Sequence, residues 1–427
     1  MAGRIRVGPG ASPVLSTSAT DFRALLSHRS FLRFWIARLV GGFANQMQAV
    51  AVGWQMYALT GSALDLGLVG LAQFAPSVAL LLVVGHVADR YDRRWVLAAC
   101  QLVDASAATT LAVLSLRGTI TREMIFALVA LIGAARAFTL PTQQTLLSAV
   151  VPASLLPRAV AANATAGQTA IVAGPALGGF LYAAGPAVVY GLCAALQVSA
   201  SALNATLRIE RRSASRNPAT AATLFAGIGY IRKRRELLGA ISLDLFAVLF
   251  GGAAALFPIY ARDILHTGPW GLGLLRSAPA VGALTMAVWL ARHPIERHAG
   301  RRMFAAIALF GACTIVFGLS RSFALSIAAL VVLGAADMVN VVVRMSLVQL
   351  RTPDEMRGRV SAVSAMFIGA SNQLGEFESG VTAAWFGTVP AVVLGGIGTL
   401  VVAWLWTRWF RELAGLDSLA GEHRSLR

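Results

Sequence analysis

The chain has 427 residues, of which 57% are hydrophobic and only 13% are charged, and its mean hydropathy is +0.69. A soluble domain carries roughly 25% charged residues, so this composition excludes a soluble enzyme, a disordered chain and a disulfide scaffold. The formal charge of +17 would suit a nucleic-acid partner, but the arginines gather between apolar runs, where they act as orientation signals, and we expect no nucleic-acid partner.

Apolar runs long enough to cross a bilayer recur along the chain, since a spanning helix needs about 20 apolar residues. They predict twelve helices, at residues 31–58, 67–86, 95–116, 122–150, 160–183, 187–208, 237–261, 271–291, 302–319, 322–350, 358–385 and 388–410. The predicted fold class is therefore an all-α membrane protein with twelve transmembrane helices in two pseudo-symmetric six-helix bundles.

The longest polar connection, between the sixth and seventh helices, divides the chain. The predicted parts are an N-terminal tail (1–30), a first bundle (31–208), a basic linker (209–236), a second bundle (237–411) and a C-terminal tail (412–427). Most basic residues fall in the tails, the linker and the loops on the same side. Both termini and the linker are therefore expected in the cytoplasm.

The two halves of the chain repeat one another. The pairs that share an offset of 201 positions are Pro152 and Pro353, Arg158 and Arg359, Gly174 and Gly375, and Gly179 and Gly380. Leu66-Gly67 matches Leu272-Gly273 at an offset of 206. A parallel repeat of six plus six helices is typical of a transporter whose substrate site lies between the halves, near the middle of the bilayer.

Ionisable residues inside the predicted helices are functional candidates, because each costs about 2.5–3.5 kcal/mol at mid-helix. The candidates for proton coupling or charge pairing are Arg38, Asp104, Arg136, Asp244, Asp337, Arg344, Glu376 and Glu378. The alternative is a structural pair within one half or snorkelling to the interface, above all for Arg344 and for Arg276, which lies nearer the outer end.

The repeat offsets suggest partners for these charges. Arg136 maps onto Asp337, and Arg38 maps onto Asp244 within one residue. We expect each couple to face across the central cavity, to join the halves in one state and to separate in the other. Glu376 and Glu378 do not share a helix face, so at most one is expected to point into the cavity.

Polar residues along the first helix are candidates for contact with a substrate. The set is Asn45, Gln46, Gln48, Trp54 and Gln55. Packing against neighbouring helices is the equal alternative. The three cysteines are far apart, and no metal-ligand spacing, phosphate loop or nucleophile motif appears, so we expect no metal, no cofactor and no enzymatic activity.

Two motifs stand out at helix ends. The loop after the second helix carries a candidate cytoplasmic gate, made of Gly85, Asp89, Arg90, Arg93 and Arg94. An acidic residue followed by arginines suits an ion-pair latch, whereas a plain positive loop is the alternative. The fifth helix contains Gly174, Pro175, Gly178 and Gly179. Its proline removes a helix hydrogen bond, and its glycines form a close-packing face.

These motifs resemble signatures of the major facilitator superfamily. The loop is similar to G-x-x-x-D-R-x-G-R-R, with Asp92 in place of the second Gly, and the fifth helix is similar to G-P-x-x-G-G, which is associated with exporters, with Ala170 in place of an earlier Gly. The segments 54–62, 273–279, 353–360 and 375–380 resemble the enterobactin-exporter-like branch.

The resemblance implies a secondary active transporter of the bacterial inner membrane. We expect a monomeric proton-coupled antiporter that exports an amphiphilic small molecule, a siderophore or a drug, by rocking alternating access. Its partners are then the substrate, protons and membrane lipid. The alternatives are an uptake symporter for a metabolite, a lipid flippase, and a non-transporting membrane sensor on the same fold.

Overall fold

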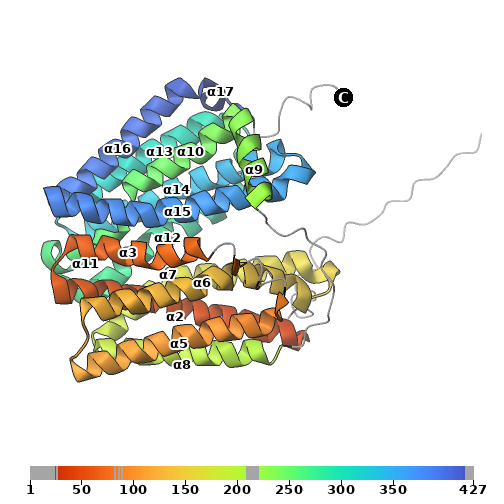
Figure 1. Ribbon diagram of the computed structural model, residues 1–427. Coiled ribbons are helices and arrows are strands. Elements are labelled where there is room, and N and C mark those ends of the chain that lie inside the picture. Colours follow the sequence, from red (N-terminus) through yellow and green to blue (C-terminus); the bar gives the residue numbers. More distant parts are fainter. Residues whose placement is uncertain are drawn as a thin grey trace, which may run out of the picture.

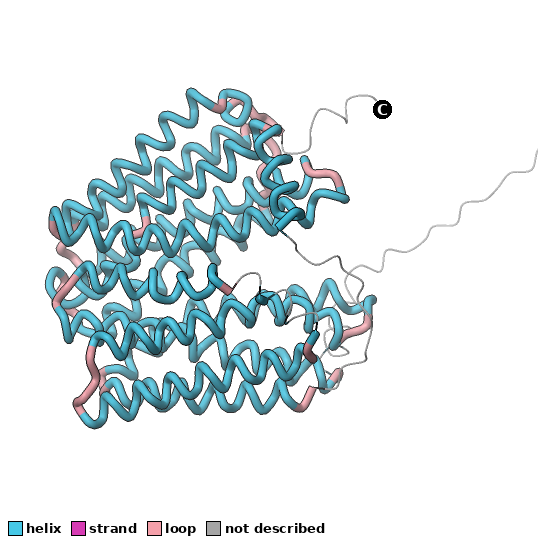
Figure 2. The backbone as a smooth tube through the Cα atoms, viewed as in Figure 1, coloured by secondary structure: helices cyan, strands magenta, loops and turns pink. Residues whose placement is uncertain are grey.

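The computed structural model describes residue 25 and residues 27–80, 83–84, 87, 90–207 and 221–418, and these residues form helices joined by short loops (Figures 1 and 2). The N-lobe contains α2 (Arg29–Thr60), α3 (Ala63–Ala79), α5 (Arg93–Arg117), α6 (Arg122–Val150), η1 (Ala153–Leu155), α7 (Leu156–Tyr182) and α8 (Pro186–Ala205). The C-lobe contains α9 (Ala221–Lys233), α10 (Arg235–Gly251), η2 (Ala253–Leu256), α11 (Phe257–Ile259), η3 (Tyr260–Ile264), α12 (Gly268–Arg292), α13 (Ala299–Leu319), α14 (Phe323–Arg351), α15 (Asp354–Phe386), α16 (Thr388–Trp409) and α17 (Arg411–Ala414).

The observed helices follow the predicted ones closely. Within the described part of the chain, eight helical segments are both long and apolar enough to cross a membrane. The other predicted spans correspond to α2, α7 and α15, which are less apolar along their length, and to α3, which has 17 described residues. The repeat is visible in the helix bounds, because α6 and α14 each have 29 residues and begin 201 positions apart, at Arg122 and Phe323.

Two segments differ from the prediction. The basic linker contains the helix α9, and the seventh span is not one regular helix. It leaves the α conformation after Gly251 and continues as a 3₁₀ turn, a short α segment and the π-helical η3. Gly252 at the break and Pro258 in the short segment explain the change, because glycine favours bends and proline removes a helix hydrogen bond.

Successive long helices run in alternating directions between the two ends of the molecule. One end, which we call the distal end, holds the connections that follow Thr60, Arg117, Tyr182, Ile264, Leu319 and Phe386. We call the opposite end the linker end. Turn chemistry marks the distal connections. Gly61 and Gly118 end their helices at φ values of +61° and +65°, and the Ser62 hydroxyl accepts a 3.1 Å hydrogen bond from the Asp65 amide.

The buried apolar residues form one core at the distal end and two at the linker end. The distal core combines both lobes, with Met56 and Tyr190 from the N-lobe and Leu256 and Leu272 from the C-lobe. At the linker end each lobe has its own core. The lobes are therefore joined distally, and Figure 1 shows their ribbons diverging toward the linker end.

Candidate functional site

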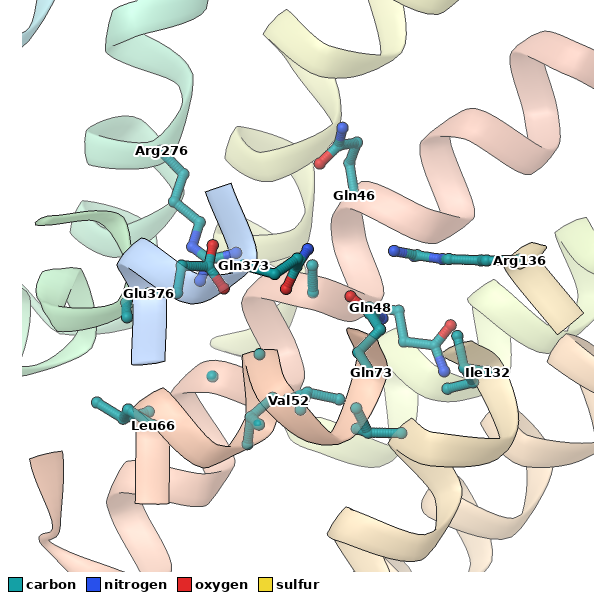
Figure 3. A pocket seen from close by; sticks show the side chains of 16 residues that line it. Gln46, Gln48, Val52, Leu66, Gln73, Ile132, Arg136, Arg276, Gln373 and Glu376 are labelled. Atoms are coloured by element: carbon teal, nitrogen blue, oxygen red, sulfur yellow. The ribbon is translucent and has the colours of Figure 1, made fainter. Parts of the chain in front are cut away.

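A cavity of about 220 Å³ lies between the lobes (Figure 3). Residues of α2, α3 and α6 line it from the N-lobe, and residues of η2, α12 and α15 line it from the C-lobe. Its polar lining consists of Gln46, Gln48, Gln73, Arg136, Arg276, Gln373 and Glu376. The structure thus contains a cavity between the two halves, with walls from both.

The N-lobe wall carries Gln48 on α2 and Arg136 on α6. Gln48 is only 3% exposed, and neither its amide nitrogen nor its amide oxygen has a partner among the described residues. The Nε of Arg136 is likewise buried without a hydrogen bond. The counter-charge of Arg136 is Asp104 on α5, which is 2% exposed and does not line the cavity. The guanidinium therefore lies between a buried carboxylate and the cavity.

The C-lobe wall carries Arg276 on α12 with Gln373 and Glu376 on α15 (Figure 3). Arg276 and Glu376 attract each other electrostatically. The Glu376 carboxylate packs so closely on α3 that a Cβ added to Gly70 would lie 2.8 Å from its Oε2. The Oε1 of Gln373 is buried with no partner in the described part of the chain. This wall thus reaches directly across to the N-lobe.

The sequence identified only some of this lining. It singled out Gln46, Gln48, Arg136, Glu376 and, less specifically, Arg276. Gln73 and Gln373 were missed, because an uncharged amide within a helix leaves no distinctive signal. Their positions opposite other glutamines emerge only from the packing of α3 against α6 and α15.

Three predicted cavity residues lie elsewhere. The Asn45 carboxamide oxygen accepts a 2.9 Å hydrogen bond from Gln197 on α8. The Gln55 amide donates to the Ser115 hydroxyl at 2.9 Å and accepts from the Tyr190 hydroxyl at 2.7 Å. Trp54 packs edge-on against Tyr182, with ring centroids 6.4 Å apart. These contacts join α2 to its neighbours, which was the packing alternative.

A second group of charges is buried inside the C-lobe. Arg344 lies 3.6 Å from the Asp244 carboxylate, and Asn340 donates a 2.6 Å hydrogen bond to that carboxylate. Arg344 also donates to the Ser364 hydroxyl at 3.3 Å. Asp337 interacts electrostatically with both Asp244 and Arg344. We call Asp244, Asp337, Asn340 and Arg344 the C-lobe charge cluster.

The charges of the expected couples have other partners in this conformation. In this conformation Asp244 and Asp337 have Arg344 as their cationic neighbour, whereas Arg136 has Asp104. Arg38 donates to the Gln143 amide oxygen on α6. These partners lie within one lobe in each case, and Arg344 is buried in a structural pair and does not snorkel.

Glu378 does not line the cavity, whereas Glu376 does. Its carboxylate accepts a 2.8 Å hydrogen bond from Thr382, one turn further along α15. Two residues rotate a helix by about 200°, so the two glutamates lie on different faces, as the spacing predicted.

The distal end is held closed by contacts that cross between the lobes. The Tyr57 hydroxyl at the end of α2 donates to the Asp263 carboxylate in η3. Arg262 donates to the Tyr57 carbonyl at 3.5 Å, and its guanidinium lies 5.6 Å from the Tyr57 ring centroid. We call Tyr57, Arg262 and Asp263 the distal latch.

Glycines bring the lobes together beside this latch. On α7, a Cβ at Gly179 would lie 2.5 Å from the Pro269 carbonyl and 2.9 Å from the Cα of Gly273 on α12. Gly67 on α3 meets Gly380 on α15 in the same way. Only glycine allows backbones to approach so closely.

The other two glycines of the fifth-helix motif pack inside the N-lobe. A Cβ at Gly174 would lie 2.6 Å from the Gln46 Cβ, and one at Gly178 would lie 2.7 Å from the Met47 Cα. Pro175 is buried within α7, and a Cβ added to Gly273 on α12 would lie 2.5 Å from the Pro175 carbonyl oxygen. The motif thus holds α7 against α2, which carries part of the cavity wall, and its last glycine contacts the C-lobe.

The gate motif is described only in part, because Gly85 and Asp89 lie outside the described residues. Arg90 is exposed, and Arg93 begins α5. Arg94 pairs with Asp92 at 3.0 Å and donates to the Leu207 carbonyl at 3.1 Å. Asp92 also caps α5 by accepting from the Arg94 amide at 3.1 Å. Arg94 thus connects the start of α5 to the end of α8 within one lobe.

No group of three or more histidine, cysteine, aspartate or glutamate side chains comes together to hold a metal ion among the residues that the structure describes. The three cysteines are buried and free. The polar groups that line the central cavity are amides, two guanidinium groups and one carboxylate.

Two helical lobes around a central polar cavity define a transporter of the major facilitator fold. A bacterial homologue of the human lysosomal transporter Spinster, solved in an inward-facing and unoccupied conformation, superposes with a TM-score of 0.71 at 12% identity, over 90% of this chain and 98% of that one. The chain belongs to the transmembrane secretion effector family, whose model matches residues 20–423. It is thus a multi-pass membrane protein and a transporter, not an enzyme.

Curated relatives of the chain are efflux proteins. Macrolide efflux protein A of Streptococcus pyogenes is 21% identical over 384 residues, which cover 87% of this chain and 93% of the relative. The multidrug efflux pump Tap of Mycolicibacterium fortuitum is 25% identical over 360 residues, which cover 81% and 87%. The major facilitator fold expected from the motifs is confirmed.

Proposed function

We propose that the protein is a proton-coupled exporter of an amphiphilic small molecule, a drug or a siderophore, which works by rocking alternating access. The observation that carries the proposal is the central cavity, whose polar groups come from both lobes and lie next to a closed distal end. The efflux relatives favour export over uptake. They favour a drug over the siderophore that the enterobactin-exporter-like segments suggest.

The orientation follows from charge. Basic residues are concentrated at the linker end, in Arg232, Lys233, Arg234 and Arg235 among others. The positive-inside rule then places the linker and both termini in the cytoplasm of a bacterial inner membrane. In that orientation the structure is inward-facing, with the distal latch on the outer side.

Rocking requires the distal contacts to separate while the linker ends approach. The contact of Gly67 with Gly380 and that of Gly179 with Gly273 are backbone contacts without interlocking side chains. No interlocked side chains therefore have to withdraw when these surfaces part. The latch is the polar part of the distal closure, and it has to break for the cavity to open outward.

Proton coupling is assigned to the C-lobe charge cluster. One guanidinium, Arg344, faces two carboxylates, Asp244 and Asp337. A proton bound by either carboxylate leaves the other paired with Arg344, so the buried cluster reaches charge balance only when it holds one proton. Arg344 lies on α14 and Asp244 lies on α10. If Arg344 gave up Asp244 as its partner, the ion pair between the two helices would be lost, and α10 could move against α14.

The test is a flux assay on the full chain in proteoliposomes with an imposed pH gradient. The substrates are a macrolide, a tetracycline and a catecholate siderophore, each assayed in both membrane orientations. Export predicts accumulation in inside-out vesicles that collapses when the gradient is dissipated. Accumulation only in right-side-out vesicles would establish the uptake symporter instead. Movement of labelled lipid without solute flux would indicate a flippase, and ligand binding without any flux a sensor.

A further inference from the structure

The two walls of the central cavity differ in what they offer a ligand (Figure 3). The N-lobe wall presents the Arg136 guanidinium and the Gln48 amide. The C-lobe wall presents the Glu376 carboxylate and the Gln373 amide oxygen. Both walls contain buried polar atoms without a partner in the described chain, namely both polar atoms of Gln48, the Nε of Arg136 and the Oε1 of Gln373.

Arg136 and Gln48 suit an anionic group. The balancing charge of Arg136, Asp104, lies behind it on α5 and outside the cavity lining, so the cavity side of the guanidinium is available to a ligand. Gln48 is 3% exposed, and a buried amide without a hydrogen bond is unfavourable. A carboxylate or phenolate that accepts from Arg136 and from the Gln48 amide nitrogen gives each of these two donors a partner.

Glu376 and Gln373 suit a basic amine. They lie three positions apart on α15, and both line the cavity. A carboxylate and an unpartnered amide oxygen together supply acceptors for the several donors of an ammonium group. Arg276 attracts Glu376 from the side, so a ligand amine would compete with it for the same carboxylate.

The remaining lining is largely apolar and includes Val52, Leu66, Val69, Val129 and Ile132. We infer that the cavity selects an amphoteric molecule, with an anionic group on Arg136 and Gln48, a basic amine on Glu376 and Gln373, and an apolar body between them. The inference rests on the proposed function only in taking this cavity as the substrate site.

The experiment compares three forms of one fluorescent probe. Norfloxacin carries a carboxylate and a basic piperazine amine, its methyl ester lacks the acid, and N-acetylnorfloxacin lacks the basic amine. Binding to the full chain in lipid nanodiscs is measured by fluorescence anisotropy. Loss of one charge-assisted hydrogen bond predicts that the wild type binds each blocked form at least about tenfold more weakly. This comparison involves no variant, so its outcome does not depend on a variant folding.

Variants then assign each end of the probe. In Arg136→Gln the preference for the acid over the ester should fall below about twofold, while the preference for the free amine persists. Glu376→Gln should show the reverse. Glu378→Gln, on the same helix but outside the lining, is the matched control and should keep both preferences.

Equal binding of the three forms by the wild type, or binding of none of them, would overturn the inference. Equal weakening of all three forms by both variants would overturn it as well. The binding assay also separates this inference from the proposed function. Amphoteric selectivity without pH-driven flux would support this inference and refute the proposed proton-coupled export. Flux without such selectivity would support the proposed export and refute this inference.

Discussion

The distal latch provides a direct test of alternating access through Tyr57→Phe. This change removes the hydroxyl that donates to Asp263 and keeps the ring and carbonyl that Arg262 contacts. A hydrogen bond to a charged group contributes about 1.5–3 kcal/mol. The Asp263 side chain is 47% exposed, so water compensates part of the loss, and about 1–2 kcal/mol remains. That difference shifts the balance toward the outward-open state by about 5- to 30-fold.

The assay is a distance measurement between spin labels at the distal end. Arg117→Cys in the N-lobe and Arg321→Cys in the C-lobe provide exposed attachment sites, and the native cysteines are buried, so labelling is selective. Double electron–electron resonance in nanodiscs should show a larger long-distance population in Tyr57→Phe. Tyr91→Phe, exposed at the linker end, is the control. An unchanged distance distribution in Tyr57→Phe would refute the role of the latch.

Further predictions concern the glycine contact and the buried charges. Gly179→Val places a branched side chain against the Pro269 carbonyl, so the rate of transport should fall by more than about tenfold. The spin labels at positions 117 and 321 should also move apart. Normal flux would contradict this. Asp337→Asn should abolish pH-driven flux while the melting temperature stays unchanged, and retained coupling would disprove its role. Arg344→Gln leaves Asp244 buried and unpaired and should cost about 3–5 kcal/mol, seen as a lower melting temperature. The second change Asp244→Asn should restore much of that loss, and no rescue would argue against the pair.

The sequence predicted the fold well because hydropathy records it directly. The bounds of α6 and α14 agree with prediction within about one residue, since apolar runs and capping signals coincide at their ends. The break at Gly252 was missed, because the segment stays uniformly apolar through the change to a 3₁₀ and a π-helical turn. The helix α9 was hidden by the polar and basic composition around it.

The candidate site was less predictable, because hydropathy does not determine which way a side chain points. Gln46, Gln48 and Gln55 all lie on α2, yet Gln55 bonds to Ser115 and Tyr190 while the first two line the cavity. That division depends on how α2 packs against α5 and α8. It is a property of tertiary contacts that no local pattern records.

The repeat explains both why the expected couples are apart in this conformation and which contacts do cross between the lobes. An offset relates equivalent positions, and equivalent positions touch only where they lie near the pseudo-twofold axis. Tyr57 and Asp263 are 206 positions apart and do meet, because both lie where the lobes join at the distal end.

Away from that axis, an offset instead converts one contact into its equivalent. The offset of 206 relates Arg38 to Asp244, and the offset of 201 relates Gln143 to Arg344. The contact of Arg38 with Gln143 in the N-lobe is therefore equivalent to that of Asp244 with Arg344 in the C-lobe, and both join the first and fourth helices of their half. In the same way, Gly67 is equivalent to Gly273 and Gly380 is equivalent to Gly179, so the contact of Gly67 with Gly380 corresponds to that of Gly273 with Gly179. The duplicated structure therefore contains one equivalent contact between the first and fourth helices of each lobe, and two equivalent glycine contacts between the lobes. Only the contact in the C-lobe contains a carboxylate, because Asp244 stands where the N-lobe has Arg38, and Arg344 where it has Gln143.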